Sequence, residues 1–199
     1  QSGNENHLIE VGEFEWAAQS GVPYVEFEGE GQYMYHPDQS FPDVEEFSIA
    51  IWFRNDQWSS SNGVGGLRPV VSKHYSSDNG SFILFGDQTS WHVAHNYNFD
   101  HSWETNQWHH VAASWTSEGR YVYADGVLVL SESADLLEIT DDLFMLGGWL
   151  NESFSSALSF DGAISSVGLW DRGLSQEEVG QLYSQQAGLP GCMTSNACN

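Results

Sequence analysis

The segment FSIAIWFR, residues 47–54, is apolar at nearly every position. A short run of this kind, rich in β-branched and aromatic residues, predicts a β-strand that is covered on both faces. Similar runs recur along the chain, and clusters of Gly, Asn, Asp and Ser separate them. This spacing is typical of a protein made of short antiparallel strands joined by turns.

Two further stretches give clear local signals. In PYVEFEG, residues 23–29, apolar and polar side chains alternate, which predicts a strand with one face buried. In RYVYADGVLVLSE, Asp125 and Gly126 lie between two alternating runs. An Asp-Gly pair readily adopts the positive φ angles of a two-residue hairpin turn, so a β-hairpin is expected here.

One segment has a helical pattern, LSQEEVGQLYSQ, residues 174–185. Ser175 is placed to cap its N-terminus, and Glu178 three residues later completes a capping box. The apolar stripe of the helix consists of Val179, Leu182 and Tyr183.

These signals predict an all-β fold, a two-sheet antiparallel β-sandwich of jelly-roll type with one short C-terminal helix. A chain of 199 residues is long enough for one such domain. We expect the domain to span residues 20–188, after an N-terminal arm or edge segment at 1–19. Residues 189–199 then form a Cys-containing linker or the start of a repeat.

The charge balance is strongly acidic, with 28 Asp and Glu against five Lys and Arg and a formal charge of −23. Such a surface repels nucleic acid and anionic membranes, so neither is expected as a partner. Only 17% of residues are charged and 14% are aromatic, which is the composition of a folded chain. The acids either keep the protein soluble at high salt or hold divalent cations. No run of 18 apolar residues is present to span a membrane.

Several motifs, in order, resemble the laminin-G-like modules of the concanavalin A-like lectin and glucanase superfamily. The opening YVEFEGEGQYMYHP is similar to the first strand pair of that family, and FSIAIWFR is similar to its next strand. NQWHHVAASWTSEGRYVYADGVLV resembles its central signature, and the long segment from LGGWLNESF to EEVGQLY resembles its closing one. The resemblance covers residues 20–187 and implies the sandwich fold.

The C-terminal GCMTSNACN resembles the opening of a short repeat found in large secreted proteins of marine Bacteroidetes. Cys192 and Cys198 are the only cysteines and can close a small disulfide loop. The chain begins at Gln1, as a mature secreted protein does after removal of its signal, and a segment cut from a longer protein would begin in the same way. We expect a secreted or cell-surface location.

The acid pattern of the glycoside hydrolases that resemble this fold, Glu-x-Asp-x-x-Glu on one strand, does not occur in the sequence. A non-catalytic lectin-like module that binds polysaccharide or cell-surface glycan is therefore the first hypothesis. A protein-adhesion or assembly module of a large cell-surface protein, with other domains as its partners, is the second. A polysaccharide-degrading enzyme with an unfamiliar site is the third.

Candidate glycan-binding residues lie mainly between Trp91 and Trp115. The run WHVAHNYNF, residues 91–99, divides by alternation into an aromatic, core-facing row and an amide-rich row. The loop that follows carries a tryptophan without strand alternation, and two other loops carry one each. An exposed indole stacks well on a sugar ring. The resulting candidates are His92, Asn96 and Asn98 from the amide row, and the loop residues Trp58, Trp103 and Trp149.

The two adjacent histidines in this region are given no chemical role. His110 occupies the Trp-x-His position of the family signature, which resembles a packed structural histidine, and His109 is expected to be filler. Trp52, Trp115 and Trp170 lie within strand patterns and are assigned to the core.

A bound Ca²⁺ is expected as cofactor. The resemblance implies a site near the first and last strands, where Glu28 and Asp161 are the matching acids, although Ser165 stands where the family has another acid. Oxygen-rich loops supply Asp78, Asp141 and Asp142 as further candidates. Ca²⁺ requires six to eight oxygen ligands.

Overall fold

The computed structural model describes residues 7–29, 31–38, 46–56, 68–73, 82–86, 90–94, 97–133, 143–150 and 157–186. Within these ranges, only the backbone is described for residues 68, 82, 83, 85, 86, 90–94, 97, 98, 150, 157 and 158. The strands are β1 (Ile9–Val11), β2 (Glu15–Gln19), β3 (Val22–Glu28), β4 (Tyr33–Tyr35), β5 (Phe47–Asn55), β6 (Arg68–Lys73), β7 (Phe82–Gly86), β8 (Ser90–Ala94), β9 (Tyr97–Asp100), β10 (Trp108–Thr116), β11 (Gly119–Ala124), β12 (Val127–Glu132), β13 (Met145–Leu146), β14 (Gly148–Leu150), β15 (Ala157–Ser159) and β16 (Asp161–Trp170). The helix α1 is Gln176–Gln186.

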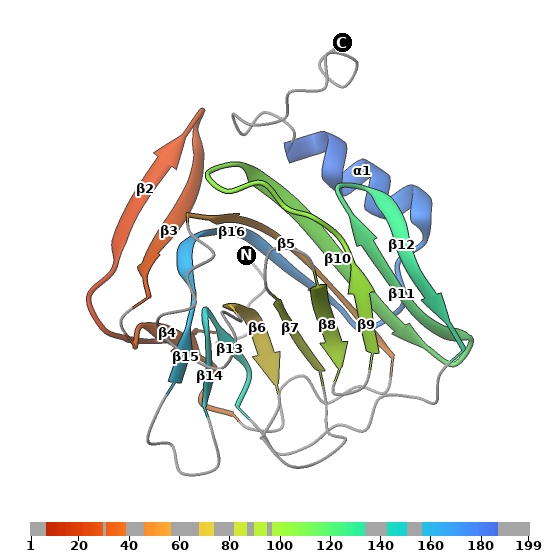
Figure 1. Ribbon diagram of the computed structural model, residues 1–199, viewed down its shortest axis with the longest axis horizontal. Helices are drawn as coiled ribbons and strands as arrows, with labels where there is room; N and C mark the ends of the chain where they lie inside the picture. Colours follow the sequence, from red (N-terminus) through yellow and green to blue (C-terminus); the bar gives the residue numbers. More distant parts are fainter. Residues whose placement is uncertain are drawn as a thin grey trace.

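Two antiparallel sheets face each other as a sandwich, as the sequence predicts (Figure 1). Sheet A has the order β1-β4-β13-β6-β7-β8-β9. Sheet B has the order β12-β11-β10-β5-β16-β3-β2. A small pair, β14-β15, lies beside them, and α1 lies against the outer side of sheet B near β11 and β12 (Figure 1).

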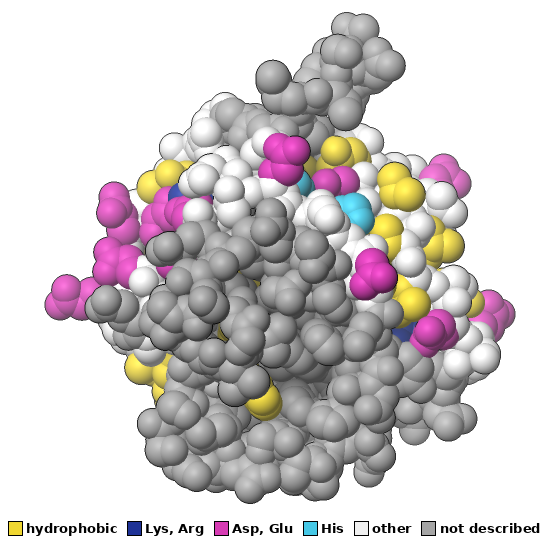
Figure 2. Space-filling view, viewed as in Figure 1, with side chains coloured by type: hydrophobic (Ala, Val, Ile, Leu, Met, Phe, Trp, Pro, Cys, Tyr) yellow, Lys and Arg dark blue, Asp and Glu magenta, His cyan; other side chains and the backbone are white. Residues whose placement is uncertain are grey.

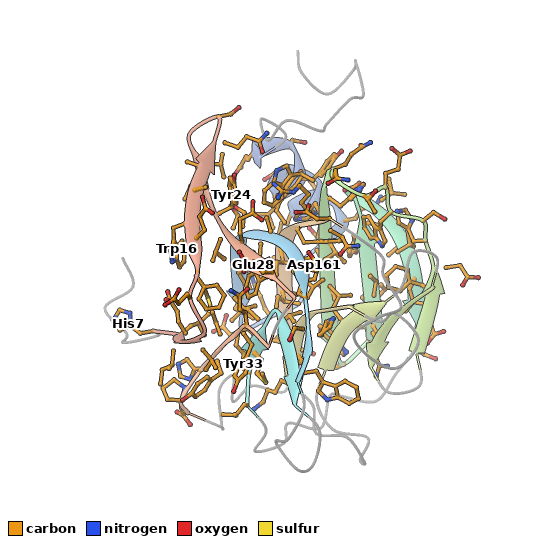
Figure 3. The ribbon with its side chains drawn as sticks, turned by 60° about the vertical axis from the view of Figure 1, so that its left-hand side comes forward. His7, Trp16, Tyr24, Glu28, Tyr33 and Asp161 are labelled. Atoms are coloured by element: carbon orange, nitrogen blue, oxygen red, sulfur yellow. The ribbon has the colours of Figure 1, made fainter. Side chains whose placement is uncertain are left out.

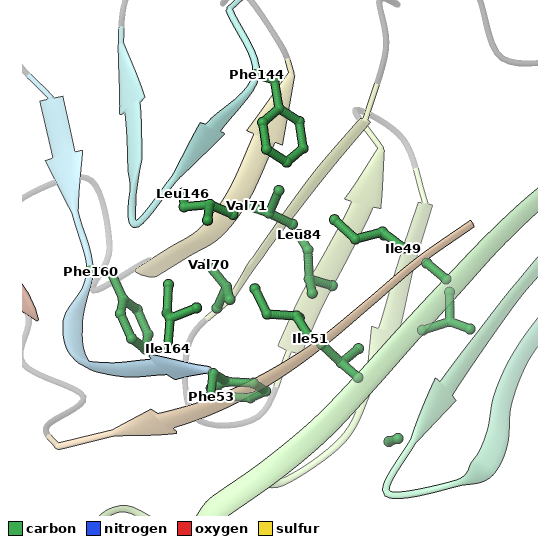
Figure 4. Packing of buried hydrophobic residues seen from close by; sticks show 14 of the residues in the cluster. Ile49, Ile51, Phe53, Val70, Val71, Leu84, Phe144, Leu146, Phe160 and Ile164 are labelled. Atoms are coloured by element: carbon green, nitrogen blue, oxygen red, sulfur yellow. The ribbon is translucent and has the colours of Figure 1, made fainter. Parts of the chain in front are cut away.

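The core between the sheets is built by the inward-facing positions of both. From sheet B, Phe47, Ile49, Ile51 and Phe53 alternate along β5 and are at most 2% exposed. They meet side chains of sheet A and the segments beside it, among them Val70, Val71, Leu84, Phe144 and Leu146 (Figure 4). Burial of this many apolar side chains is the main force that holds the two layers together.

The outer face of sheet B is also covered, which explains why β5 is apolar on both sides. Ala50 belongs to a second cluster with Leu174 and Val179 at the start of α1. Trp52 belongs to a third, and its ring stacks on Tyr183 of α1 at 5.6 Å between centroids. Every residue from Phe47 to Phe53 is therefore buried, which confirms the prediction for this strand.

The predicted turn and cap are both present. Asp125 and Gly126 have φ angles of 47° and 79° and join β11 to β12 as a tight hairpin. At the start of α1, the backbone N–H of Glu178 donates to Ser175 Oγ (3.2 Å) and that of Ser175 donates to the Glu178 carboxylate (2.9 Å). This reciprocal pair is the predicted capping box.

The N-terminal segment supplies an edge strand to each sheet. β1 pairs with β4 in sheet A, and β2 pairs with β3 in sheet B. Residues 9–19 are thus an edge segment rather than a detached arm. Two acidic residues face each other in this region, since Glu15 is the register partner of Glu26.

The interpretation of residues 91–99 as a single strand is wrong. The chain reverses between Ala94 and Tyr97, so that β8 and β9 pair as a hairpin with Trp91 opposite Phe99 and His92 opposite Asn98. Cross-strand partners share a face, so the pairs 91/99 and 92/98 keep the rows that alternation along one strand would give. A register shift between His92 and Ala94 places Ala94 opposite Tyr97, so the two rows are not kept at the tip of the hairpin. Phe99 is 4% exposed and lies in the core, as its row predicts.

Candidate functional site

The predicted glycan-binding residues do not form one site in the described part of the chain. Trp103 is 1% exposed, so the prediction of an exposed loop tryptophan is wrong. Its ring packs edge-on against Phe53 (5.2 Å) and His109 (4.8 Å), because the loop before β10 folds over the open end of the core. Trp149 lies in β14 rather than a loop and is half-buried.

The other members of this set stay predictions. The backbones of His92 and Asn98 are register partners on β8 and β9. Trp58 and Asn96 lie outside the described residues, and so do Cys192 and Cys198.

The two histidines have separate structural environments. His110 is 1% exposed, and its ring packs against Trp52 (5.3 Å) and Tyr183 (6.0 Å), which confirms it as a packed histidine. Burial lowers the pKa of His110 to about 4, so its imidazole is neutral near pH 7. His109 is more than filler, since its nitrogens lie 3.0 Å from Asp125 Oδ2 and 3.1 Å from the carbonyl oxygen of Glu104.

The predicted calcium acids Glu28 and Asp161 are brought together, directly opposite each other on β3 and β16 (Figure 3). Gly29 makes the chain turn here with a φ of 73°, and a Cβ at this position would lie 3.1 Å from the Cβ of Asp161. Gly31 follows, and its N–H donates to Ser159 Oγ at 2.9 Å. Like charges placed directly opposite each other in a sheet repel.

The described residues do not assemble a full calcium shell. Within the ranges that the structure describes, no three His, Cys, Asp or Glu side chains lie close enough to hold a metal ion. Glu28 and Asp161 provide two carboxylates, fewer oxygens than the six to eight that Ca²⁺ takes. Asp78, Asp141 and Asp142 lie outside the described residues.

A polar cleft of about 470 Å³ lies at one end of the outer face of sheet B. Its volume falls within the range of about 300–1,000 Å³ that is usual for ligand sites. The cleft is formed by the residue before β5, the turn from β10 to β11, the outward side chains of β11 and the segment before α1. The lining residues are Glu46, Thr116, Ser117, Glu118, Tyr121, Tyr123, Arg172, Gly173, Leu174 and Ser175.

Buried hydroxyl groups hold the wall of this polar cleft in place. Ser48 Oγ donates to the carbonyl oxygen of Arg172 (2.8 Å), accepts from the N–H of Leu174 (2.9 Å) and bonds Ser114 Oγ (2.7 Å). Gly173 passes so close to Thr116 that an added Cβ would lie 2.4 Å from its Cγ2. Two strands of sheet B therefore fix the segment 172–175 as a rigid wall.

Carboxylates and an arginine line the mouth of the polar cleft. Glu46 accepts a hydrogen bond from the backbone N–H of Ser117 at 2.7 Å. Hydrogen bonding with the side chain and the backbone of Ser117 lowers the pKa of the Glu46 carboxyl. Arg172 makes a two-pronged ion pair with Glu178, at 2.5 and 3.0 Å, which lowers the pKa of Glu178 to about 2. Both carboxyl groups are thus ionised at neutral pH and accept hydrogen bonds rather than donate a proton.

The floor of the polar cleft has two tyrosines, at alternate positions of β11. Burial raises the pKa of the Tyr123 phenol, which therefore stays a neutral hydrogen-bond donor. Tyr121 is half-buried and exposes part of its ring. Hydroxyls, ionised carboxylates and an aromatic face together match a ligand rich in hydroxyl groups. The sequence hid this site because residues 116–123 and 172–175 lie far apart in the chain.

The surface outside this polar cleft is acidic. Figure 2 shows acidic side chains scattered around the rim of the visible face, with very little basic surface among the described residues. No feature of a nucleic-acid-binding surface is present in that part of the protein. Among the described residues, no helix has the length and apolar character needed to cross a bilayer.

The fold is a two-sheet β-sandwich, and comparison with known families places it further. A laminin G family model, described as the concanavalin A-like lectin/glucanases superfamily, matches residues 28–180. The chain therefore belongs to the concanavalin A-like lectin/glucanase superfamily, as the motifs predicted.

The curated relatives are very long proteins. The chain is 30% identical over 175 residues to the sushi, von Willebrand factor type A, EGF and pentraxin domain-containing protein 1 of Rattus norvegicus. It is 30% identical over 175 residues to the protein of that name in Mus musculus. In both cases the match covers 80% of this chain and only about 5% of the relative.

Solved structures share the fold at low sequence identity. Domain 4 of AbnA, an extracellular arabinanase from Geobacillus stearothermophilus solved with arabinotriose, has a TM-score of 0.64 and 18% identity. The match covers 87% of this chain and 82% of that domain. The binding domain of botulinum neurotoxin serotype D has a TM-score of 0.66 and 16% identity, over 93% of this chain and 48% of that one.

Proposed function

We propose that the chain is a secreted or cell-surface, non-catalytic, lectin-like module that binds a neutral polysaccharide or cell-surface glycan in the polar cleft of sheet B. The observation that carries the proposal is the composition of this polar cleft, where four hydroxyl side chains, two carboxylates and one arginine surround the half-buried ring of Tyr121. Sugars present many hydroxyl groups and an apolar ring face, and such a lining satisfies both.

A neutral ligand fits the charges better than a uronate. Arg172 is the one basic side chain in the lining of the polar cleft, and Glu178 already pairs with it. An anionic sugar would meet the carboxylates of Glu46 and Glu118 without a free cation to balance it. The match to the arabinotriose-bound domain of AbnA supports the fold that the proposal needs, and arabinan is a reasonable member of the test panel.

The non-catalytic assignment rests on the absent acid motif and on the state of the carboxyl groups in the cleft. A glycosidase of the usual kind needs one carboxyl group that keeps its proton near neutral pH and donates it to the leaving group. The hydrogen bonds around Glu46 in the lining, and around Glu178 beside it, lower the pKa of both carboxyl groups and so act in the opposite direction. Release of reducing sugar from any polysaccharide in the panel would favour the alternative of an enzyme.

Affinity electrophoresis against a polysaccharide panel, followed by titration with the best binder, tests the proposal. Tyr121→Ala removes the ring from the floor of the polar cleft and is expected to weaken binding at least tenfold. Tyr33→Ala is the matched control, because Tyr33 is also a half-buried strand tyrosine but lies on sheet A. If Tyr121→Ala binds like the unchanged protein, the glycan does not bind in this cleft.

The remaining loop and amide-row residues form the second arm of the same experiment. Loss of binding in Trp58→Ala, Trp149→Ala or Asn98→Ala, with normal binding in Tyr121→Ala, would place the glycan on the surface predicted from the sequence instead.

Ca²⁺ is proposed to bind at the Glu28–Asp161 pair and to stabilise the edge of sheet B.

A second candidate function is protein adhesion or assembly within a large extracellular protein, with other domains as partners. Two observations favour it. The matching region forms about 5% of relatives whose names describe several kinds of domain. In addition, Trp16 is 60% exposed on the edge strand β2, where a partner chain could pair (Figure 3). If this function is right, the protein binds no glycan of the panel. It instead forms a complex with a partner chain, and Trp16→Ser disrupts that complex.

A further inference from the structure

A second cavity, of about 240 Å³, lies beneath α1 on the outer face of sheet B. It is separate from the polar cleft, and its walls are mostly apolar. Strand β16 and α1 provide the sides, while β5 and β10 provide the floor. The lining residues are Ala50, Trp52, His110, Ser166, Val167, Gly168, Trp170 and Leu182.

Two deeply buried polar atoms of the lining residues lack partners. Trp52 and His110 are each 1% exposed, and neither Trp52 Nε1 nor His110 Nδ1 has a hydrogen-bond partner among the described residues. Buried polar groups are nearly always bonded, and each one left unsatisfied is costly. The two rings lie 5.3 Å apart between centroids and line the same cavity. Both unsatisfied nitrogens therefore belong to rings that line this cavity.

The mouth of the cavity is formed by an irregular part of β16. Ser165 pairs with Trp52 and Gly168 pairs with Ala50, so one extra residue is inserted on β16 as a bulge. Within it Ser166 has a φ of 50°, which is uncommon for a residue other than glycine. Val167 is 36% exposed beside it. Bulges and strained residues of this kind gather at binding sites, where they re-aim side chains.

We infer that the cavity beneath α1 binds a small, uncharged molecule that has one hydroxyl group on an apolar, aromatic-sized body. A hydroxyl oxygen accepts from the Trp52 indole N–H and donates to the acceptor nitrogen that His110 offers in one tautomer. The aromatic and aliphatic walls suit the rest of such a molecule. A sugar would bury several more hydroxyls than Trp52, His110 and Ser166 can bond, which disfavours it here. The lining has no charged side chain, since the His110 imidazole is neutral.

Phenol is the probe for this inference, with benzene as the matched molecule that lacks the hydroxyl. Indole N–H signals in ¹H–¹⁵N correlation spectra report on binding, and Trp52→Phe identifies the Trp52 signal. Phenol is expected to shift that signal in a saturable way, and benzene to bind at least tenfold more weakly. Binding of phenol is expected to fall at least tenfold in Trp52→Phe and to be unchanged in Trp108→Phe. Trp108 donates its indole N–H to Gln19 on the same sheet face but does not line the cavity.

Ala50→Val gives a second, independent test in case the loss of the Trp52 ring harms the fold. The added methyl groups narrow the cavity, while the nitrogens of Trp52 and His110 stay in place. This variant is expected to stay folded and to lose phenol binding at least tenfold. A Trp52 signal that phenol does not move up to its solubility limit would overturn the inference. A crystal soaked with phenol that shows ordered water only at Trp52 Nε1 and His110 Nδ1 would overturn it as well.

Discussion

The carboxylate of Asp125 bonds two successive residues of the neighbouring strand, because Oδ2 lies 3.0 Å from His109 Nδ1 and Oδ1 accepts from the backbone N–H of His110 at 2.7 Å. The backbone N–H of Asp125 also donates to the carbonyl oxygen of His110 at 2.7 Å. One turn residue thus joins the β11–β12 hairpin to β10. It does so at the end of sheet B that Trp103 covers from inside.

Replacement of Asp125 should separate its role in the turn from its role as an anchor. Asp125→Asn keeps a residue that tolerates positive φ but loses the charge, and we expect it to lower the free energy of unfolding by about 1–3 kcal/mol. Asp125→Ala should cost more, because alanine disfavours the φ of 47°. Urea unfolding of both variants measures the difference. Equal stability of Asp125→Asn and the unchanged protein would show that the charged bonds contribute nothing.

Local sequence patterns sufficed to predict the fold because its strands, turn and cap follow short-range chemistry. Phe47 to Phe53 reveal a strand buried on both faces, and Ser175 with Glu178 reveal the helix start. The reversal between Ala94 and Tyr97 was missed, because residues 91 and 99, and residues 92 and 98, share a face in the hairpin as they would along one strand. When no Gly marks a turn, the alternation of apolar and polar residues does not show by itself where the chain reverses.

The candidate sites depended on long-range packing and were harder to predict. Trp103 has the sequence context of an exposed loop residue, but its loop closes over the core, and no local pattern reports this. Glu28 and Asp161 were paired through the family resemblance, and the register places them opposite each other. The polar cleft brings Tyr121 and Gly173 together, and the buried Ser48 bonds the residue on each side of Gly173, a relation that only the folded chain makes visible.

The capping box of α1 gives a second prediction. Ser175→Ala removes the hydroxyl that accepts from the N–H of Glu178, and should lower the free energy of unfolding by about 1 kcal/mol. Ser184→Ala, in the last turn of the same helix, is the matched control and should change stability far less. Thermal unfolding followed by circular dichroism compares the two. A Ser175→Ala variant no less stable than Ser184→Ala would contradict the role of the cap.

The Glu28–Asp161 pair gives a third prediction, which concerns calcium. If Ca²⁺ binds there, 1 mM Ca²⁺ should raise the melting temperature of the EDTA-treated protein, since a ligand at 100 times its Kd stabilises by about 2.7 kcal/mol. Glu28→Gln should abolish this rise and, in EDTA, should melt slightly higher than the unchanged protein because the opposed charges are gone.

The control for the calcium experiment is Glu132→Gln on β12, an acid at the opposite side of sheet B. This variant should keep the full response to Ca²⁺. A melting temperature that does not change on addition of EDTA and then excess Ca²⁺ would exclude the proposed site.

The burial of His110 gives a fourth prediction, a loss of stability in mild acid. The unfolded chain takes up a proton at this residue near its ordinary pKa of 6.5, whereas the folded protein does so only near pH 4. The unfolded state therefore binds more protons between these values, so this contribution to stability is complete above pH 6.5 and is lost as the pH falls to 4. The loss should reach about 3 kcal/mol. His110→Gln cannot titrate, so its deficit relative to the unchanged protein at pH 7 should shrink by about this amount at pH 4. The control is His7→Gln, at an exposed position, whose stability should follow that of the unchanged protein at every pH. If the stability deficit of His110→Gln stays the same from pH 7 to pH 4, the buried imidazole carries no such penalty.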